Sequence, residues 1–148
     1  MAELAEAFTR QLKMKYVCAQ HEQGAGFMAE GYAKARGVPG FVITTSGPGA
    51  GNILTCLQNC YFDSTPLIAI TGQVSSNLMR PPKSALRQRG FQEAPTVECV
   101  RPITKFAALV QGPLHGMYSL ETAIKEAKSG RPGPVLLDIP SDVQRAEI

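Results

Sequence analysis

The chain has 148 residues, which is enough for one ordinary domain with a real core and too few for two. An apolar fraction of 44% and a charged fraction of 18% are typical of a soluble globular protein and exclude a disordered chain. Fifteen Lys and Arg residues against twelve Asp and Glu give a formal charge of +3, too small an excess to indicate nucleic-acid binding.

The predicted elements alternate between helices and short apolar strands. Near-continuous apolar runs predict buried strands at 15–19, 41–45, 67–71, 106–110 and 134–140. Helical patterns are found at about 3–12, 22–36, 50–62 and 117–129. This alternation predicts an α/β fold that is doubly wound, with a mostly parallel sheet and helices on both of its faces.

One long segment interrupts the alternation. The stretch from Gln73 to Pro95 is rich in basic residues and proline and contains no clear strand. A loop of this length in a compact α/β domain is usually functional or mobile. Its basic side chains fit either a carboxylate or phosphate on a substrate, or simply a solvated surface.

The four cysteines contain no C-x-x-C spacing. Cys56 and Cys60 stand four residues apart on a predicted helix, so we expect them to be small buried apolar side chains. A metal site would need further ligands nearby, and the only histidines are His21 and His115. We therefore expect no metal site within this chain.

The carboxyl ends of the predicted strands mark the place to look for a ligand. In an open parallel sheet, ligands bind beyond these ends, where loops lead into helices. Residues 21–23, 46–52 and 72–73 follow the first three predicted strands there, and the long loop continues from the last of them. These segments should share one edge of the sheet.

The glycine-rich turn "SGPGAGN" does not match the common phosphate-binding motifs. A P-loop requires Gly-Lys-Ser/Thr, whereas Gly51 is followed by Asn52 and Ile53. The dinucleotide pattern G-x-G-x-x-G fails as well, because Asn52 stands where its third glycine should be. The glycines fit a tight turn with close helix packing, and generic nucleotide binding is disfavoured.

Glu22 and His21 would each have a structural explanation if they stood alone. An acidic residue in the first turn of a helix interacts favourably with the helix dipole, and a single histidine usually has a structural role. Their neighbours change this interpretation. The segments "HEQGAGFMAEGYAKARG", "FVITTSGPGAGN", "YFDSTPLIAITGQV", "GFQEAP", "RPITKFA" and "RPGPVLLDIPSDVQ" occur in that order along the chain.

This series of segments resembles the N-terminal pyrimidine-binding domain of thiamine diphosphate enzymes, and in particular the acetolactate synthase large-subunit group. The resemblance extends from about residue 16 to residue 145. It implies the thiamine diphosphate-binding fold, with residues 1–148 as a single pyrimidine-binding domain belonging to a longer multidomain enzyme. The first strand of that fold, with its turn, has no counterpart here.

The resemblance assigns the catalytic role to Glu22, which matches the glutamate that hydrogen-bonds N1′ of the aminopyrimidine ring. A carboxyl at N1′ shifts the ring toward its imino tautomer, and the 4′-imino group can then remove the C2 proton. We expect burial against an apolar wall to raise the pKa of Glu22 and favour its neutral form.

The other site residues are assigned in the same way. Gly47, Pro48 and Asn52 match positions that contact the pyrimidine ring or border its pocket. Gln92 matches a glutamine at the cofactor and substrate end of the site, and Phe91 should line the approach.

The implied cofactors are thiamine diphosphate and Mg²⁺. The Mg²⁺ ion is expected to bind to a domain that this chain does not contain. The full-length enzyme could also use FAD, a point that the resemblance leaves open. The implied reaction decarboxylates a pyruvate-like 2-oxo acid and transfers the acyl-anion equivalent. The alternatives are a decarboxylase or lyase acting on another substrate, or a non-catalytic domain that serves oligomerisation.

The expected partners are a diphosphate-binding domain of the same or another subunit and a second copy of the chain in a homo-oligomer. The isolated chain should be inactive. The N-terminal 15 residues contain no apolar leader, and no run approaches the roughly 18 apolar residues of a membrane span. We therefore expect a cytoplasmic protein that binds neither membrane nor nucleic acid.

Overall fold

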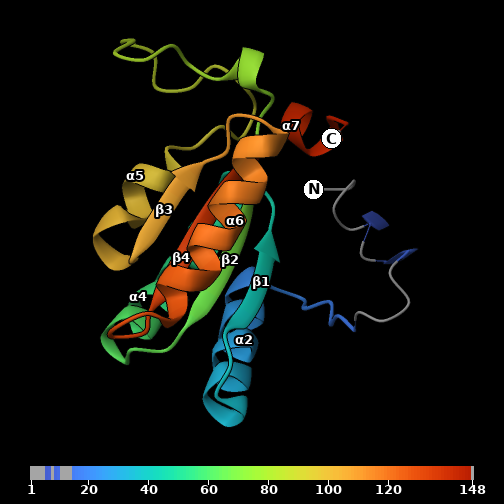
Figure 1. Cartoon of the computed structure of the whole chain (residues 1–148). Helices are drawn as coiled ribbons and strands as arrows, with labels where there is room; N and C mark the ends of the chain where they lie inside the picture. The colour runs from blue at the N-terminus through green and yellow to red at the C-terminus, as the bar shows by residue number, and fades with distance from the viewer. Residues whose placement is uncertain (1–5, 8, 11–14, 148) are drawn as a thin grey trace.

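A computed structural model describes residues 6, 7, 9, 10 and 15–147. Its strands form one sheet with the order β1-β2-β4-β3, in which every described pairing is parallel (Figure 1). The strands are β1 (Gly40–Thr44), β2 (Leu67–Gln73), β3 (Phe106–Leu109) and β4 (Pro134–Pro140). The predicted α/β fold with a parallel sheet is confirmed.

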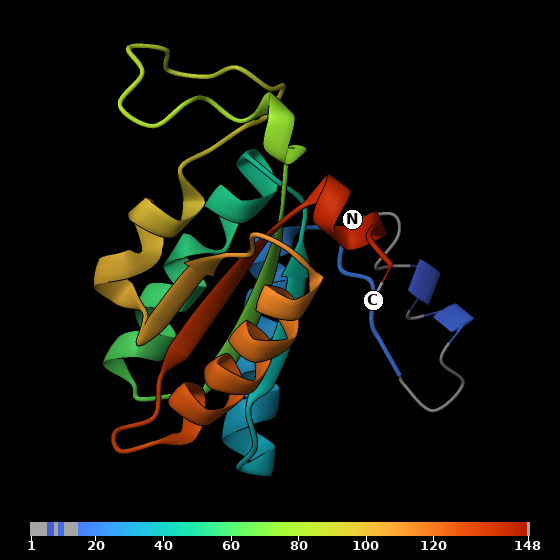
Figure 2. The same cartoon turned by 45° about the horizontal axis from the view of Figure 1, so that its top comes forward.

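Helices cover both faces of this sheet (Figure 2). The helical elements are α2 (Glu22–Arg36), α3 (Pro48–Asn52), α4 (Leu54–Phe62), α5 (Thr96–Val100), α6 (Pro113–Lys128), α7 (Ser141–Arg145), and the 3-10 turns η1 (Ser76–Leu78) and η2 (Arg101–Ile103). One apolar cluster joins α2, α4 and α5 to the sheet, and a second joins α6 to its opposite face. The fold is therefore doubly wound, as predicted.

Most predicted elements are present, with two differences. The helix expected at 50–62 is divided at Ile53 into α3 and α4, and α6 begins at Pro113, earlier than expected. The helix expected at 3–12 falls mostly outside the described residues. In the part of the chain that the structure describes, no helix is both long enough and apolar enough to cross a membrane.

The strand predicted at 15–19 is wrong, because these residues lie in no helix or strand. An apolar run becomes a strand only where a neighbouring strand can pair with it, and the described ladders involve β1 to β4 alone. Tyr16 is 56% exposed and Val17 is 79% exposed, so the apolar character of this segment does not reflect burial in this chain.

The position of α2 is fixed by its ends and by one close contact. His21 caps the helix, since its Nδ1 accepts a hydrogen bond from the backbone N–H of Gln23 at 3.1 Å. Gly37 ends it in the left-handed conformation, with φ of 67°. A Cβ on Gly40 would lie 2.1 Å from the carbonyl oxygen of Ala29, so glycine is needed for α2 to pack this closely on β1.

Candidate functional site

Two predicted site residues meet at the carboxyl edge of the sheet. Glu22 opens α2, and Asn52 ends α3, the short helix that follows β1. The side-chain Nδ2 of Asn52 donates a hydrogen bond to Oε2 of Glu22 at 3.0 Å. The two segments that sequence analysis assigned to one site are therefore joined by a direct side-chain contact.

The electrostatic state of Glu22 differs from the prediction. The hydrogen bond from Asn52 is the main factor that lowers the pKa of Glu22, and a backbone hydrogen bond adds to it. Burial opposes this shift only weakly, because the side chain is half-buried. The expectation that an apolar wall raises this pKa is wrong for this chain, in which Glu22 is partly exposed.

The glycine-rich turn packs closely against the side chains of Thr45 and Glu22. A Cβ on Gly49 would lie 2.5 Å from Cγ2 of Thr45 and 3.2 Å from Oε1 of Glu22. Pro48 occupies the first turn of α3, a position where its missing N–H removes no helical hydrogen bond. The turn therefore brings the α3 backbone close to the carboxylate.

Gly47 and Gln92 also lie against each other. Gly47 has φ of 58°, and a Cβ there would lie 2.6 Å from the carbonyl oxygen of Gln92. Gln92 itself has φ of 61°, a backbone conformation that is uncommon outside glycine. Phe91 is 84% exposed, so its side chain projects into solvent beside this contact.

Glu93 organises the long loop, a role that sequence analysis missed. Its Oε1 accepts the backbone N–H of Arg80 at 2.7 Å, and its Oε2 accepts those of Arg89 at 2.8 Å and Gly90 at 3.3 Å. Partial burial raises the pKa of Glu93, but these three donors outweigh it and hold the pKa below its usual value. The motif "GFQEAP" contained this residue, although nothing in its spacing indicated the contacts.

A buried polar group ties the same loop to the sheet. Asp138 on β4 accepts hydrogen bonds from Oγ1 of Thr71 at 2.7 Å and from Nε2 of Gln73 at 2.9 Å. Nε2 of Gln73 also donates to the carbonyl oxygen of Ala94 at 2.8 Å. Burial raises the pKa of Asp138 to about 6, against the effect of both donors. The only sequence signal was a carboxylate within the apolar run "PVLLDIP".

A cleft lies beside this loop, and neither Glu22 nor Asn52 lines it. It is bordered by β3, by the start of α5 and by residues 79–83. Arg80 and Lys83 contribute positive charge to its lining, and Glu93 and Glu98 contribute negative charge. This mixture does not form a dedicated basic pocket, so substrate binding by the basic residues stays a prediction.

The structure also places His21 and the four cysteines. His21 is the N-cap of α2, which agrees with the structural explanation for a single histidine. Cys56 and Cys60 are fully buried, as predicted, whereas Cys18 and Cys99 are exposed.

Known proteins resemble this chain over nearly its whole length. It is 46% identical to acetolactate synthase, chloroplastic, from Arabidopsis thaliana over 143 residues, which are 97% of this chain and 20% of that protein. The catalytic subunit of mitochondrial acetolactate synthase from Saccharomyces cerevisiae is 45% identical over 134 residues, 90% of this chain and 18% of that protein. The acetolactate synthase large subunit of Corynebacterium glutamicum is 46% identical over 136 residues, 92% of this chain and 21% of that protein.

The chain thus spans about a fifth of the length of the curated relatives that it matches. The sequence profile of one family, described as "Thiamine pyrophosphate enzyme, N-terminal TPP binding domain", matches residues 1–98. That match covers more than half of the chain and includes both the Glu22 segment and the glycine-rich turn. The chain belongs to the thiamine pyrophosphate enzyme family, as its N-terminal TPP binding domain.

Proposed function

We propose that this chain is the pyrimidine-binding half of a thiamine diphosphate-dependent enzyme of the acetolactate synthase type, with Glu22 as the proton partner of N1′. The observation that carries the proposal is the hydrogen bond from Asn52 to Glu22, which joins the start of α2 to the glycine-rich turn. The names of the relatives support the class of reaction.

The residues around Glu22 fit an aminopyrimidine ring. Asn52 engages Oε2, and the Glu22 side chain is partly exposed, so a ring could reach it from solvent. A neutral carboxyl group can donate a hydrogen bond to an unprotonated ring nitrogen. Pro48 and Gly47 would border the ring, and Gln92 would lie at the end where substrate enters.

Glu22 would have to change its protonation state as the site is assembled. In this chain the carboxylate is favoured, because Asn52 stabilises the charge and water reaches the side chain. A ring and a second protein domain placed over Glu22 would remove that water and shift the balance toward the neutral acid. The neutral acid can place a proton on N1′, and the anion can take it back.

Thiamine diphosphate, when bound, supplies the electron sink for loss of carbon dioxide from a 2-oxo acid. This chain would contribute proton placement and the shape of the pyrimidine pocket. Mg²⁺ and the diphosphate would be held by a separate domain of the same or another subunit, so residues 1–148 would form one domain of a homo-oligomer. Use of FAD stays open, and a cytoplasmic location stays a prediction.

Product analysis tests the reaction class. The full-length enzyme encoded with this domain should release carbon dioxide from pyruvate and form acetolactate when thiamine diphosphate and Mg²⁺ are present, and the 148-residue chain alone should not. Release of carbon dioxide with an aldehyde product would instead indicate a simple decarboxylase. If thiamine diphosphate neither binds nor supports any turnover, the domain serves assembly and the proposal fails.

A further inference from the structure

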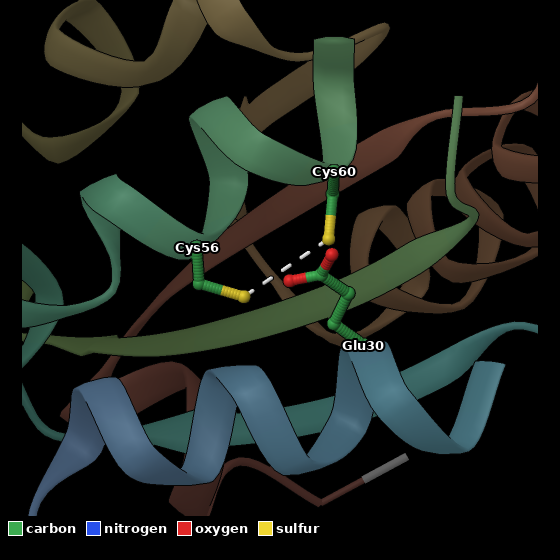
Figure 3. A group of neighbouring side chains, drawn as sticks. All are labelled: Glu30, Cys56 and Cys60. Atoms are coloured by element: carbon green, nitrogen blue, oxygen red, sulfur yellow. Dashed lines mark hydrogen bonds between the residues drawn. The ribbon is translucent and has the colours of Figure 1, made fainter. Parts of the chain in front are cut away.

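Two helices bring two thiols and a carboxylate together inside the protein. Cys56 and Cys60 lie one turn apart on α4, and Glu30 extends toward them from α2 (Figure 3). One possible ligand atom from each residue lies within 4.8 Å of the other two. Both cysteines are fully buried and Glu30 is 4% exposed, so the cluster is shielded from water.

The Glu30 carboxylate is only partly satisfied. Its Oε1 accepts hydrogen bonds from Nδ2 of Asn59 and Nζ of Lys34, each at 2.6 Å. Its Oε2 is buried and has no hydrogen-bond partner in the part of the chain that the structure describes. Because buried carboxylate oxygens are normally paired, an unpaired oxygen on a carboxylate that lies beside two sulfur atoms points to a ligand.

A disulfide does not explain the two thiols. Their sulfur atoms lie 4.0 Å apart, whereas a disulfide requires about 2.05 Å. Side chains one turn apart on a helix also hold their Cβ atoms about 5–6 Å apart, and a disulfide requires about 3.8 Å. Joining Cys56 to Cys60 would therefore require α4 to unwind locally.

The geometry and charge of the cluster suit a zinc-class ion. Zinc binds thiolate at about 2.3 Å, so tetrahedral coordination places two sulfur atoms about 3.8 Å apart, close to the separation of Cys56 and Cys60. Two thiolates and the Glu30 carboxylate carry three negative charges, which Zn²⁺ and the Lys34 ammonium, shared with Asp63 at 2.7 Å, would largely offset. Mg²⁺ and Ca²⁺ are unsuitable, because both prefer oxygen ligands alone.

We propose that Glu30, Cys56 and Cys60 form a buried site for Zn²⁺ or a related thiophilic divalent ion and supply three of its ligands. The site was not predictable from the cysteine spacing, since Glu30 reaches it only through the packing of α2 on α4. Hydrogen bonding with Cys56 raises the pKa of the Cys60 thiol, and burial adds to the effect. The ion would have to displace the thiol protons, so binding should weaken as pH falls.

An ion bound here would link α2 to α4, the helices next to which Glu22 and Asn52 lie. Helices α2 and α4 pack closely at Gly26, since a Cβ on this residue would lie 2.9 Å from Cβ of Cys56. Glu22 stands at the start of α2, and Asn52 lies just before α4. The ion would therefore stabilise the relative position of the elements that carry this hydrogen-bonded pair.

Cobalt substitution tests the site. The untagged chain, expressed in minimal medium with Co²⁺ replacing zinc, should contain about one cobalt per chain and show thiolate-to-cobalt charge-transfer absorption in the near ultraviolet. The zinc-loaded chain should have a Tm about 5–10 °C above that of the metal-free chain, as expected for ligation to the folded state alone. Mg²⁺ should leave the Tm unchanged.

Three variants separate this site from adventitious binding. Cys60→Ala and Glu30→Gln should each lose the cobalt, whereas Cys99→Ala, which removes an exposed thiol outside the cluster, should retain it. If Cys60→Ala fails to fold, the metal content of the wild type and of Glu30→Gln still decides the question. A wild-type chain without cobalt or its absorption band, or a folded Cys60→Ala variant that retains both, would overturn the proposal.

Discussion

Asn52 donates a hydrogen bond to Glu22 across 30 residues of sequence, with 3.0 Å between Nδ2 and Oε2. The contact connects the end of α3 to the start of α2 and holds the pKa of Glu22 below its usual value. Asn52 is thus both a neighbour of the proposed pyrimidine pocket and the residue that positions its carboxylate.

Replacing Asn52 should change the titration of Glu22. In Asn52→Ala the carboxylate loses its main stabilising donor, so the pKa of Glu22 should rise toward its ordinary value. Side-chain carboxyl NMR of the labelled chain measures this directly. The exposed Asn77 on η1 provides a control, and Asn77→Ala should leave the pKa of Glu22 unchanged. No rise in Asn52→Ala would exclude the amide as the cause.

The two glycines of α3 should respond in opposite ways to alanine. Gly49→Ala places a Cβ 2.5 Å from Thr45 and next to Glu22, so it should destabilise the chain by about 1–3 kcal/mol. Gly51→Ala meets no atom within 4 Å and should be neutral or stabilising by about 0.5–1 kcal/mol. Denaturant unfolding measures both values, and equal effects would contradict the proposed packing at Gly49.

Asp138 should make the chain less stable as pH rises from about 4 to about 6. Its folded pKa of about 6 lies above the ordinary value of 3.8, so the folded state holds the proton more tightly. That stabilisation is present below about pH 4 and is lost as pH rises through the folded pKa, a change on the order of 3 kcal/mol.

The variant Asp138→Asn should remove this pH dependence. An asparagine can accept from Gln73 and donate to Thr71, so the contacts survive while the titration disappears. Urea unfolding at pH 4, 5, 6 and 7 compares the two proteins. An unchanged slope between pH 4 and 6 in the variant would mean that other groups dominate this range.

Glu93 should keep the long loop in place. In Glu93→Gln the three backbone N–H groups of Arg80, Arg89 and Gly90 lose a charged acceptor, and their amide exchange should accelerate by about tenfold or more. Glu98→Gln provides a control on the exposed face of α5. Unchanged exchange in Glu93→Gln would show that the loop is held by other contacts.

The fold could be predicted largely because the buried strands have apolar sequences. β2 and β4 are almost completely buried, and their sequences are near-continuous apolar runs. The segment 15–19 is also mostly apolar, yet it forms no strand. The apolar character of a segment does not specify which strand it pairs with. The break between α3 and α4 at Ile53 could not be predicted from the sequence, because the pattern of buried residues continues across it.

The proposed site could be predicted where its residues lie within motifs, and not where they act through tertiary contacts. Glu22, Asn52 and Gln92 were identified from motif order, and the structure brings Glu22 to Asn52 and Gln92 to Gly47. The supporting contacts of Glu93 and Asp138 were missed, because their partners are set by how the long loop lies against the sheet.

The central claim is that Glu22 places a proton on the aminopyrimidine ring, and hydrogen–deuterium exchange at C2 of bound thiamine diphosphate tests it most directly. In the full-length enzyme, Glu22→Gln should slow this exchange by on the order of a hundredfold, the usual scale for positioned proton transfer. Glu121→Gln on the exposed side of α6 should not change it. Exchange in Glu22→Gln at the wild-type rate, with the cofactor bound, would contradict the account.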